Sequence, residues 1–259
     1  MKIAVCLKQV PDTLEIDIEP ETGRIMREKV RGVINPYDLH ALEEAVKIKE
    51  TTKGRVFAFT MGPQQSESIL REALSKGADE GFLLSGREFA GSDTLATSKA
   101  LAEALRRISP DIIICGKQAV DGDTAQVGPG IAAHLDIPFA AFVSRVIKIN
   151  QKKIIIERLS DSGKEILESV LPFLMTVVRE CNTPRPAGIN SMLFALSSTL
   201  KHINASDLGL TPDNSGLTGS PTSVASISVA EHKKQCRRLS SADIKNYELV
   251  VNLAKAALQ

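Results

Sequence analysis

Short apolar runs alternate with helical segments along the first 135 residues, and this alternation restricts the fold more than any other feature of the sequence. The runs at residues 2–7, 55–60, 80–84 and 111–115 have the length and composition of buried strands. Strands that alternate with helices pair in parallel through right-handed crossovers. We therefore predict an α/β fold with a doubly wound, mostly parallel sheet.

Local signals predict where the helices between these strands begin. Asn35 is a favoured N-cap, and Pro36 suits the first helical position. Asp123–Gln126 resembles a capping box, so another helix should begin there. The predicted helices cover residues 36–53, 64–76, 93–108 and 124–135.

The loop from Gly116 to Asp123 follows a predicted strand and opens a helix. Ligands of open α/β sheets bind at such places, where free N–H groups of a helix start favour an anion. Asp121 and Asp123 would repel a pyrophosphate, so we assign them to helix capping, ribose hydroxyls or loop hydrogen bonds and leave phosphates to backbone N–H groups and Lys117. The loops after residues 7 and 60 should reach the same crevice, although a capped strand–loop–helix without a ligand has the same local pattern.

The second half of the chain changes to strand-like runs separated by short turns, which predict antiparallel additions. These runs cover residues 139–149, 153–159, 165–170 and 173–178, and a small hairpin is expected around residues 14–25. Residues 206–223 look like a surface arm, and residues 240–258 like a helix that packs on the core or on a partner subunit. We predict a domain over residues 1–181 and a partner-contacting arm and helix over residues 182–259.

Composition excludes several classes of function. With 32 basic and 31 acidic side chains and 4% aromatic residues, the chain has neither the charge nor the stacking platforms of a nucleic-acid-binding protein. Its four cysteines are dispersed without a metal-ligand or disulfide pattern, which favours a cytoplasmic location. No apolar stretch approaches the ~20 residues of a membrane span. We expect no metal site and no catalytic acid, base or nucleophile, because Cys6 and Cys115 look like packing residues.

Several long, ordered motifs give the chain a resemblance to the beta subunits of electron transfer flavoproteins. They are KQVPDT at 8–13, INPYDLHALEEAVKIKE at 34–50, GPQQ at 62–65, CGKQAVDGDTAQVGP at 115–129 and IERLSDSGKEILESVLPFLMTV at 156–177. The resemblance implies a Rossmann-like, adenine-nucleotide-binding fold. It also implies a heterodimer with a larger alpha subunit that passes electrons between a donor and a partner dehydrogenase or other redox protein.

The resemblance also implies which residues bind the nucleotide, and these coincide with the loops around the predicted crevice. Simple members of the family hold AMP there, whereas electron-bifurcating members hold a second FAD that accepts hydride from NADH. Small residues at Gly122, Ala125 and Gly128 would leave room for a flavin ring, so we favour FAD over AMP. The candidate cofactor-binding residues are Cys6, Asn35, Pro36, Tyr37, Asp38, Met61, Gly116, Gln118, Asp121, Asp123, Thr124, Ala125, Gln126, Val127, Gly128, Pro129, Gly130 and Ile131.

The family carries an apolar anchor for its partner dehydrogenase after an Asn-x-Pro-Arg turn, and Ile189 is the corresponding candidate here. The lysines that commonly follow are replaced by Phe194–Ser198, which puts the usual acyl-CoA dehydrogenase partner in doubt. An alternative interpretation is a sensor that binds adenine nucleotide without a redox role. Its prediction is a monomer that purifies without an alpha subunit.

Overall fold

The computed structural model describes residues 1–12 and 32–223, together with Glu248, Val251, Asn252 and Lys255. It divides into two compact units, Met1–Ser223 and Val224–Gln259. The four described residues of the second unit are helical. The hairpin predicted around residues 14–25 and most of the helix predicted over residues 240–258 lie outside the described residues.

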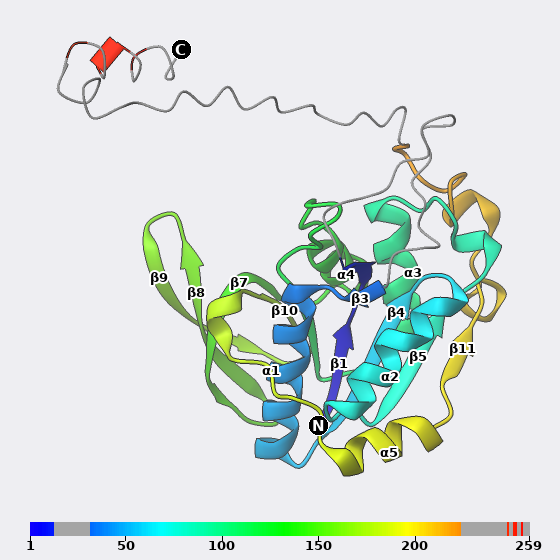
Figure 1. The fold of residues 1–259 in the computed structure, drawn as a ribbon, viewed down its shortest axis with the longest axis horizontal. Helices are drawn as coiled ribbons and strands as arrows, with labels where there is room; N and C mark the ends of the chain where they lie inside the picture. The colour runs from blue at the N-terminus through cyan, green and yellow to red at the C-terminus, as the bar shows by residue number, and fades with distance from the viewer. Residues whose placement is uncertain (13–31, 224–247, 249–250, 253–254, 256–259) are drawn as a thin grey trace. The chain divides into compact units, whose positions relative to one another are not determined.

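A nine-stranded sheet forms the centre of the first unit (Figure 1). Its order is β11-β5-β4-β1-β6-β10-β7-β8-β9, and all pairs are parallel except β7–β8 and β8–β9. The α/β prediction with a mostly parallel sheet is therefore confirmed. The strands are β1 (Lys2–Cys6), β4 (Arg55–Met61), β5 (Glu80–Leu84), β6 (Ile112–Gly116), β7 (Phe139–Ile149), β8 (Lys153–Ser160), β9 (Gly163–Val170), β10 (Phe173–Val177) and β11 (Lys201–Ile203).

Helices cover both faces of the central strands, which explains why those strands are apolar on both sides. Side chains of β1 alternate between two clusters: Ile3 and Val5 pack with α1 and α2, whereas Ala4 and Cys6 pack with α3 and α4. In Figure 1, α1 and α2 lie in front of the sheet. The helices are α1 (Pro36–Thr52), α2 (Glu67–Ser75), α3 (Thr94–Arg106), α4 (Val127–Leu135) and α5 (Ile189–Ser197).

Two details of the predicted fold were wrong. The run at residues 173–178 was assigned to the antiparallel additions, but β10 is a central strand that pairs in parallel with both β6 and β7. The helix expected from Asp123 begins at Val127, and Gln126, its N-cap, makes no capping bond with its side chain. Asp123 instead accepts a hydrogen bond from Gln118 Nε2 at 2.6 Å.

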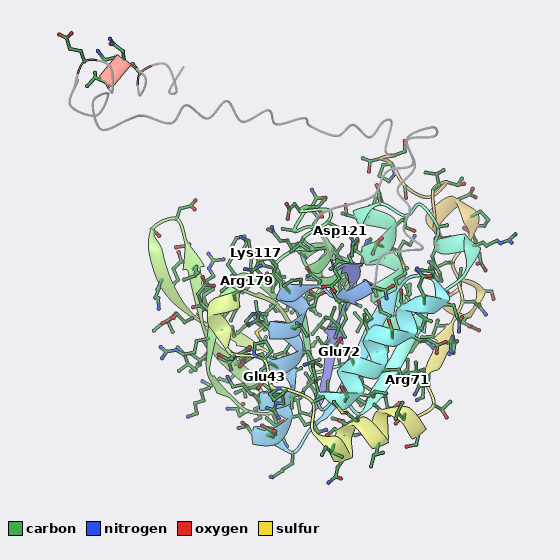
Figure 2. The ribbon with its side chains drawn as sticks, in the orientation of Figure 1. Glu43, Arg71, Glu72, Lys117, Asp121 and Arg179 are labelled. Carbon is green, nitrogen blue, oxygen red and sulfur yellow. The ribbon has the colours of Figure 1, made fainter. Side chains whose placement is uncertain are left out.

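The segment after β10 also contains elements that were not predicted. α5 packs against α2, and β11 adds a parallel strand beside β5. Arg71 of α2 donates to the carbonyl oxygens of Ala195 and Ser198 at 2.6 Å each, which satisfies groups at the end of α5 (Figure 2). Residues 182–223 therefore pack with the same compact unit as the sheet. Short 3-10 helices occur at Gln64–Ser66, Arg87–Phe89, Arg179–Cys181, Ser206–Leu208 and Pro212–Asn214.

A bidentate ion pair fixes the segment that leads into α5. Arg185 donates to both carboxylate oxygens of Glu43, at 2.9 and 3.0 Å, and to Glu50 at 2.6 Å. The Glu43 side chain is only 8% exposed, so its charge depends on this partner. The Arg185 guanidinium in turn holds the pKa of Glu50 below its ordinary value.

Replacing Arg185 with methionine is expected to lower the free energy of unfolding by about 2 kcal/mol, because Glu43 would lose its charged partner. Arg55→Met removes a comparable pair with Glu80 in which the arginine is 61% exposed, and should change stability by less than about 1 kcal/mol. Urea unfolding of both variants measures the difference. Equal losses in the two variants would contradict the structural role assigned to Arg185.

Candidate functional site

The strand order reverses between β1 and β6. From β1 the chain crosses to β4 and then β5 on one side, and afterwards returns to β6 on the other side of β1. In doubly wound sheets the crevice outside the carboxyl ends of two such strands is the usual ligand site. Here that crevice lies between the loop after β1, beginning at Leu7, and the loop after β6, beginning at Lys117.

The first turn of α1 connects the two sides of this crevice. Asp38 accepts a hydrogen bond from the Lys8 N–H on Oδ2 at 2.7 Å and from the Gly116 N–H on Oδ1 at 3.1 Å. Asn35 Nδ2 donates to the Gln118 carbonyl at 2.8 Å, and Asn35 Oδ1 accepts from the Val120 N–H at 3.1 Å. Two side chains of one helix start therefore hold loops that are more than 100 residues apart in the sequence.

The carboxyl group of Asp38 is buried, at 6% exposure, and burial raises its pKa from 3.8 to about 7. Hydrogen bonds from Lys8, Asn35 and Gly116 lower the pKa and offset part of this effect. Asn35 is fully buried. These side chains therefore bind the protein's own loops and are not free to bind a ligand.

The loop between β6 and α4 presents its side chains to solvent. Asp121, Asp123 and Thr124 are exposed, and Lys8 Nζ pairs with Asp121 at 2.7 Å across the crevice. Asp123 and Ala125 adopt left-handed backbone angles, with φ of 51° and 55°. Non-glycine residues rarely adopt this conformation, and such strain clusters at binding sites.

Glycines along this segment have different roles. A Cβ at Gly116 would lie 2.7 Å from the backbone carbon of Tyr37, so only glycine lets α1 approach β6 this closely. Gly128 and Gly130 meet Thr176 of β10 and Ser98 of α3 in the same way, so they allow close packing of α4 within the protein. Gly122, in contrast, has Lys8 Nζ at 3.8 Å as its nearest neighbour and faces open space.

Cys6 and Cys115 lie opposite each other on β1 and β6 and point to the same face of the sheet. Their exposures are 7% and 6%. A hydrogen bond with Cys6, together with burial, raises the pKa of the Cys115 thiol well above its ordinary value. Cys115 is therefore a poor nucleophile. The burial of both side chains agrees with a packing role.

The structure gathers most of the residues predicted for the site around the ends of β1, β4 and β6. Met61 ends β4 on the same face as Cys6, and Val127 begins α4 beside it. Ile131 of α4 is fully buried in the core, so its side chain does not face the crevice. Ile189 begins α5, which packs on α2. Lys8, Phe142 and Arg179 also lie at this rim but were not predicted, because the strands and turns that carry them give no signal in isolation.

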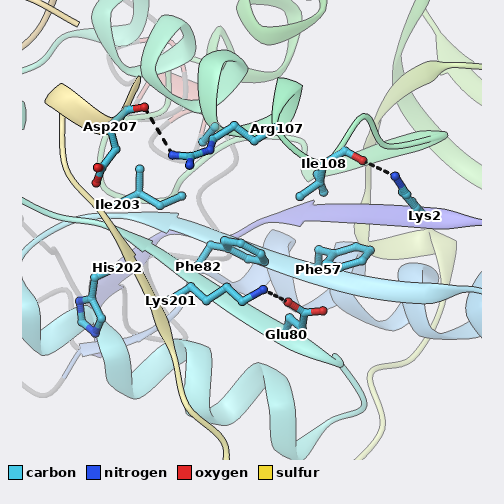
Figure 3. Close-up of a pocket in the computed structure, with 11 residues that line it drawn as sticks. Lys2, Phe57, Glu80, Phe82, Arg107, Ile108, Lys201, His202, Ile203 and Asp207 are labelled. Carbon is cyan, nitrogen blue, oxygen red and sulfur yellow. Dashed lines mark hydrogen bonds and ion pairs between the residues drawn. The ribbon is translucent and has the colours of Figure 1, made fainter. Parts of the chain in front are cut away.

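A separate groove of about 680 Å³ lies at the opposite, amino-terminal edge of the sheet (Figure 3). Its charged groups are already engaged: Lys2 Nζ donates to the Ile108 carbonyl at 2.8 Å, and Lys201 pairs with Glu80 at 2.5 Å. Since ligands of open α/β sheets bind at the carboxyl ends of the strands, we assign the site to the crevice and not to this groove.

The described residues lack two further features. They contain no group of three or more His, Cys, Asp or Glu side chains placed to hold a metal ion. They also contain no helix that is both long enough and apolar enough to span a membrane.

Comparison with known proteins agrees with this architecture. A family model described as electron transfer flavoprotein domain matches residues 22–197. The electron transfer flavoprotein subunit beta of Thermoanaerobacterium thermosaccharolyticum is 45% identical over 256 residues, which are 98% of this chain and 97% of that protein. Subunit CarD of the caffeyl-CoA reductase-Etf complex of Acetobacterium woodii is 46% identical and covers 86% of each chain. Protein FixA of Sinorhizobium fredii is 44% identical over 91% of this chain and 85% of that protein. The chain therefore belongs to the electron transfer flavoprotein family, as one of its beta subunits.

Proposed function

We propose that the crevice between β1 and β6 binds FAD, and that the chain passes electrons in a heterodimer with an alpha subunit. The residues present fit an adenine nucleotide. Exposed Asp121, Asp123 and Thr124 offer acceptors and a hydroxyl for ribose and adenine, and the N–H groups at the start of α4 favour an anion. A bound flavin supplies the redox chemistry, and the protein supplies position and electrostatics.

The open space at Gly122 is the observation that favours FAD over AMP. Among the described residues, and apart from the two chain neighbours of Gly122, only Lys8 Nζ lies within 4 Å of a Cβ placed there, so the outer part of the loop leaves room for a ring larger than adenine. A relative named as a subunit of a reductase-Etf complex supports a place in a multi-subunit redox assembly. We extend the proposal to NADH as the electron donor and to bifurcation between two flavins. The family assignment favours this electron-transfer role over a nucleotide sensor.

The bound nucleotide decides between the two cofactors. The chain is co-expressed with its alpha subunit, and the purified heterodimer is denatured. We expect it to release about two flavins, which mass spectrometry of the extract identifies. One flavin with one AMP would restrict the chain to simple electron transfer. A complex whose beta chain contributes no nucleotide would refute the site.

We further propose that Ile189 is an anchor for a partner redox protein. It is 78% exposed at the start of α5, and Leu193 and Leu196 on the same helix are 61% and 75% exposed. Apolar side chains exposed in this number on one short helix are typical of an interaction surface. The hydrogen bonds of Arg71 to the end of α5, and the ion pairs of Arg185 with Glu43 and Glu50 before it, would hold that surface in place.

Ile189→Asp is expected to leave the melting temperature unchanged, because the side chain is exposed, and to slow electron transfer to the partner dehydrogenase about tenfold. Ile147→Asp, at a position on β7 that is 42% exposed, serves as the control. Stopped-flow reduction of the dehydrogenase by the reduced heterodimer measures both. If the two variants behave alike, Ile189 is not the anchor.

A cytoplasmic location is part of the same proposal. It is supported by the cysteines of the described residues, since Cys6, Cys115 and Cys181 are all buried and unpaired.

A further inference from the structure

Two cations lie at the carboxyl ends of β6 and β10, on the same rim as the crevice. Lys117 follows β6 directly, and its N–H donates to the carbonyl of Val177, the last residue of β10, at 2.9 Å. Arg179 lies two residues beyond Val177 and is exposed. Figure 2 labels both side chains at this end of the sheet, near Asp121.

Each cation lies over an aromatic ring. Lys117 Nζ is 5.3 Å from the centre of the Phe142 ring, and the Arg179 guanidinium is 4.9 Å from the centre of the Tyr37 ring. Among the residues that the structure describes, neither side chain forms a salt bridge. Aromatic faces attract a cation without neutralising its charge, so both groups remain able to bind an anion.

Phe142 holds its ring under Lys117 in an unfavourable backbone conformation. Its φ is 59°, a region that bulky residues rarely adopt, and the adjoining pairing of β7 with β10 is irregular. The Phe142 N–H donates to Thr176 Oγ1 at 3.3 Å, which helps to retain this conformation. Strain that surrounding structure maintains next to a ligand crevice is an independent sign of function.

The distribution of charge around the crevice favours one position for an anionic group. The exposed Asp121 and Asp123 line the loop before α4, where Asp121 already pairs with Lys8. These carboxylates repel a second negative charge. The cations without a carboxylate partner in the described part of this rim, Lys117 and Arg179, attract it.

We propose that Lys117 and Arg179 form a phosphate-binding pair that selects nucleotides with a diphosphate over nucleoside monophosphates. The proposal rests on the proposed function, since it assigns the second phosphate of a dinucleotide cofactor within the same crevice. The N–H groups at the start of α4 then bind the first phosphate. A guanidinium and an ammonium group suit this role because both form charge-assisted hydrogen bonds with phosphate oxygens.

The test compares AMP with ADP on the heterodimer stripped of its nucleotides, by calorimetric titration. For the unsubstituted complex, ADP is expected to bind about tenfold more tightly than AMP. The double variant Lys117→Gln, Arg179→Gln should lose this preference and keep its affinity for AMP within about twofold. Because both substitutions lie in this chain, the change in preference reports this site and not that of the alpha subunit.

Charge-matched controls are Lys152→Gln and Arg87→Gln, at exposed positions that follow β7 and β5 and not β6 or β10, which should leave the preference unchanged. The double exchange Lys117→Arg, Arg179→Lys keeps both positive charges and should retain part of the preference for ADP over AMP. If ADP and AMP bind equally to the unsubstituted complex, the phosphate-binding pair is refuted while the nucleotide site stands. If neither nucleotide binds, the proposed function itself fails. If the double variant keeps the preference but binds the alpha subunit more weakly, the cations recognise partner carboxylates, and our inference is overturned.

Discussion

Replacing Gly116 with alanine is expected to destabilise the protein by about 3 kcal/mol or more and to abolish nucleotide binding. The new Cβ would lie 2.7 Å from the backbone carbon of Tyr37 and 2.8 Å from the Asp38 nitrogen. Backbone atoms cannot move aside as a flexible side chain can. The first turn of α1 must therefore separate from β6, and the hydrogen bond from Gly116 to Asp38 is lost with it.

Gly122→Ala, in the loop that follows β6, is the matched control for stability, because its nearest neighbour is a flexible lysine tip at 3.8 Å. It should change stability by less than about 0.5 kcal/mol. Its nucleotide content is not a control, since Gly122 borders the space proposed for the flavin ring. Chemical denaturation of the heterodimer, followed by quantification of retained nucleotide, measures both consequences. A Gly116→Ala complex that keeps its nucleotide and its stability would show that α1 and β6 are not held together as described.

The second large effect is a dependence of stability on pH that is carried by Asp38. The ordinary pKa of an aspartate, which applies to the unfolded chain, is 3.8, and the pKa of Asp38 in the folded protein is about 7. The folded state therefore binds the proton more tightly. The stability contributed by the protonated form is complete below pH 4 and is lost as the pH rises through 7. At about 1.4 kcal/mol for each tenfold change in proton affinity, the total is about 4 kcal/mol at most.

Asp38→Asn removes this titration while it preserves the shape of the side chain. The free energy of unfolding of the unsubstituted protein, relative to Asp38→Asn, should fall by about 2.5 kcal/mol between pH 5 and pH 8. Urea unfolding at several pH values gives this difference directly. Taking the difference between the two proteins cancels other groups, such as Glu50, whose lowered pKa affects stability mainly in acid. Parallel pH profiles would mean that Asp38 ionises in the folded state as it does in water.

The alternation of strands and helices was sufficient to predict the central sheet. Runs such as Ile112–Cys115 are buried on both faces, and only a parallel strand covered by helices on both sides needs such continuous apolarity. Asn35 and Pro36 likewise marked the start of α1 correctly. The function of Asn35 differed from the expected capping role, since its amide holds the loop at residues 118–120 and does not cap its own helix.

Local sequence patterns did not predict which strands pair when they are far apart in the sequence. β10 follows the β8–β9 hairpin in the sequence, yet it inserts between β6 and β7, and no turn signal encodes that choice. The start of α4 was misplaced because Asp123 finds a better donor in Gln118 than in the helix. The strand β11 was missed because it contains only three residues, Lys201–Ile203, which are too few to show a periodicity.

The crevice is assembled from segments near residues 8, 38, 116 and 177, and α4 packs on Thr176 through Gly128. A ribosome must therefore deliver more than two thirds of the polypeptide before any coenzyme can be retained. Under the proposed function, loading is a late event in biogenesis, and a chain that carries its coenzyme has already synthesised every strand of the sheet from β1 to β10.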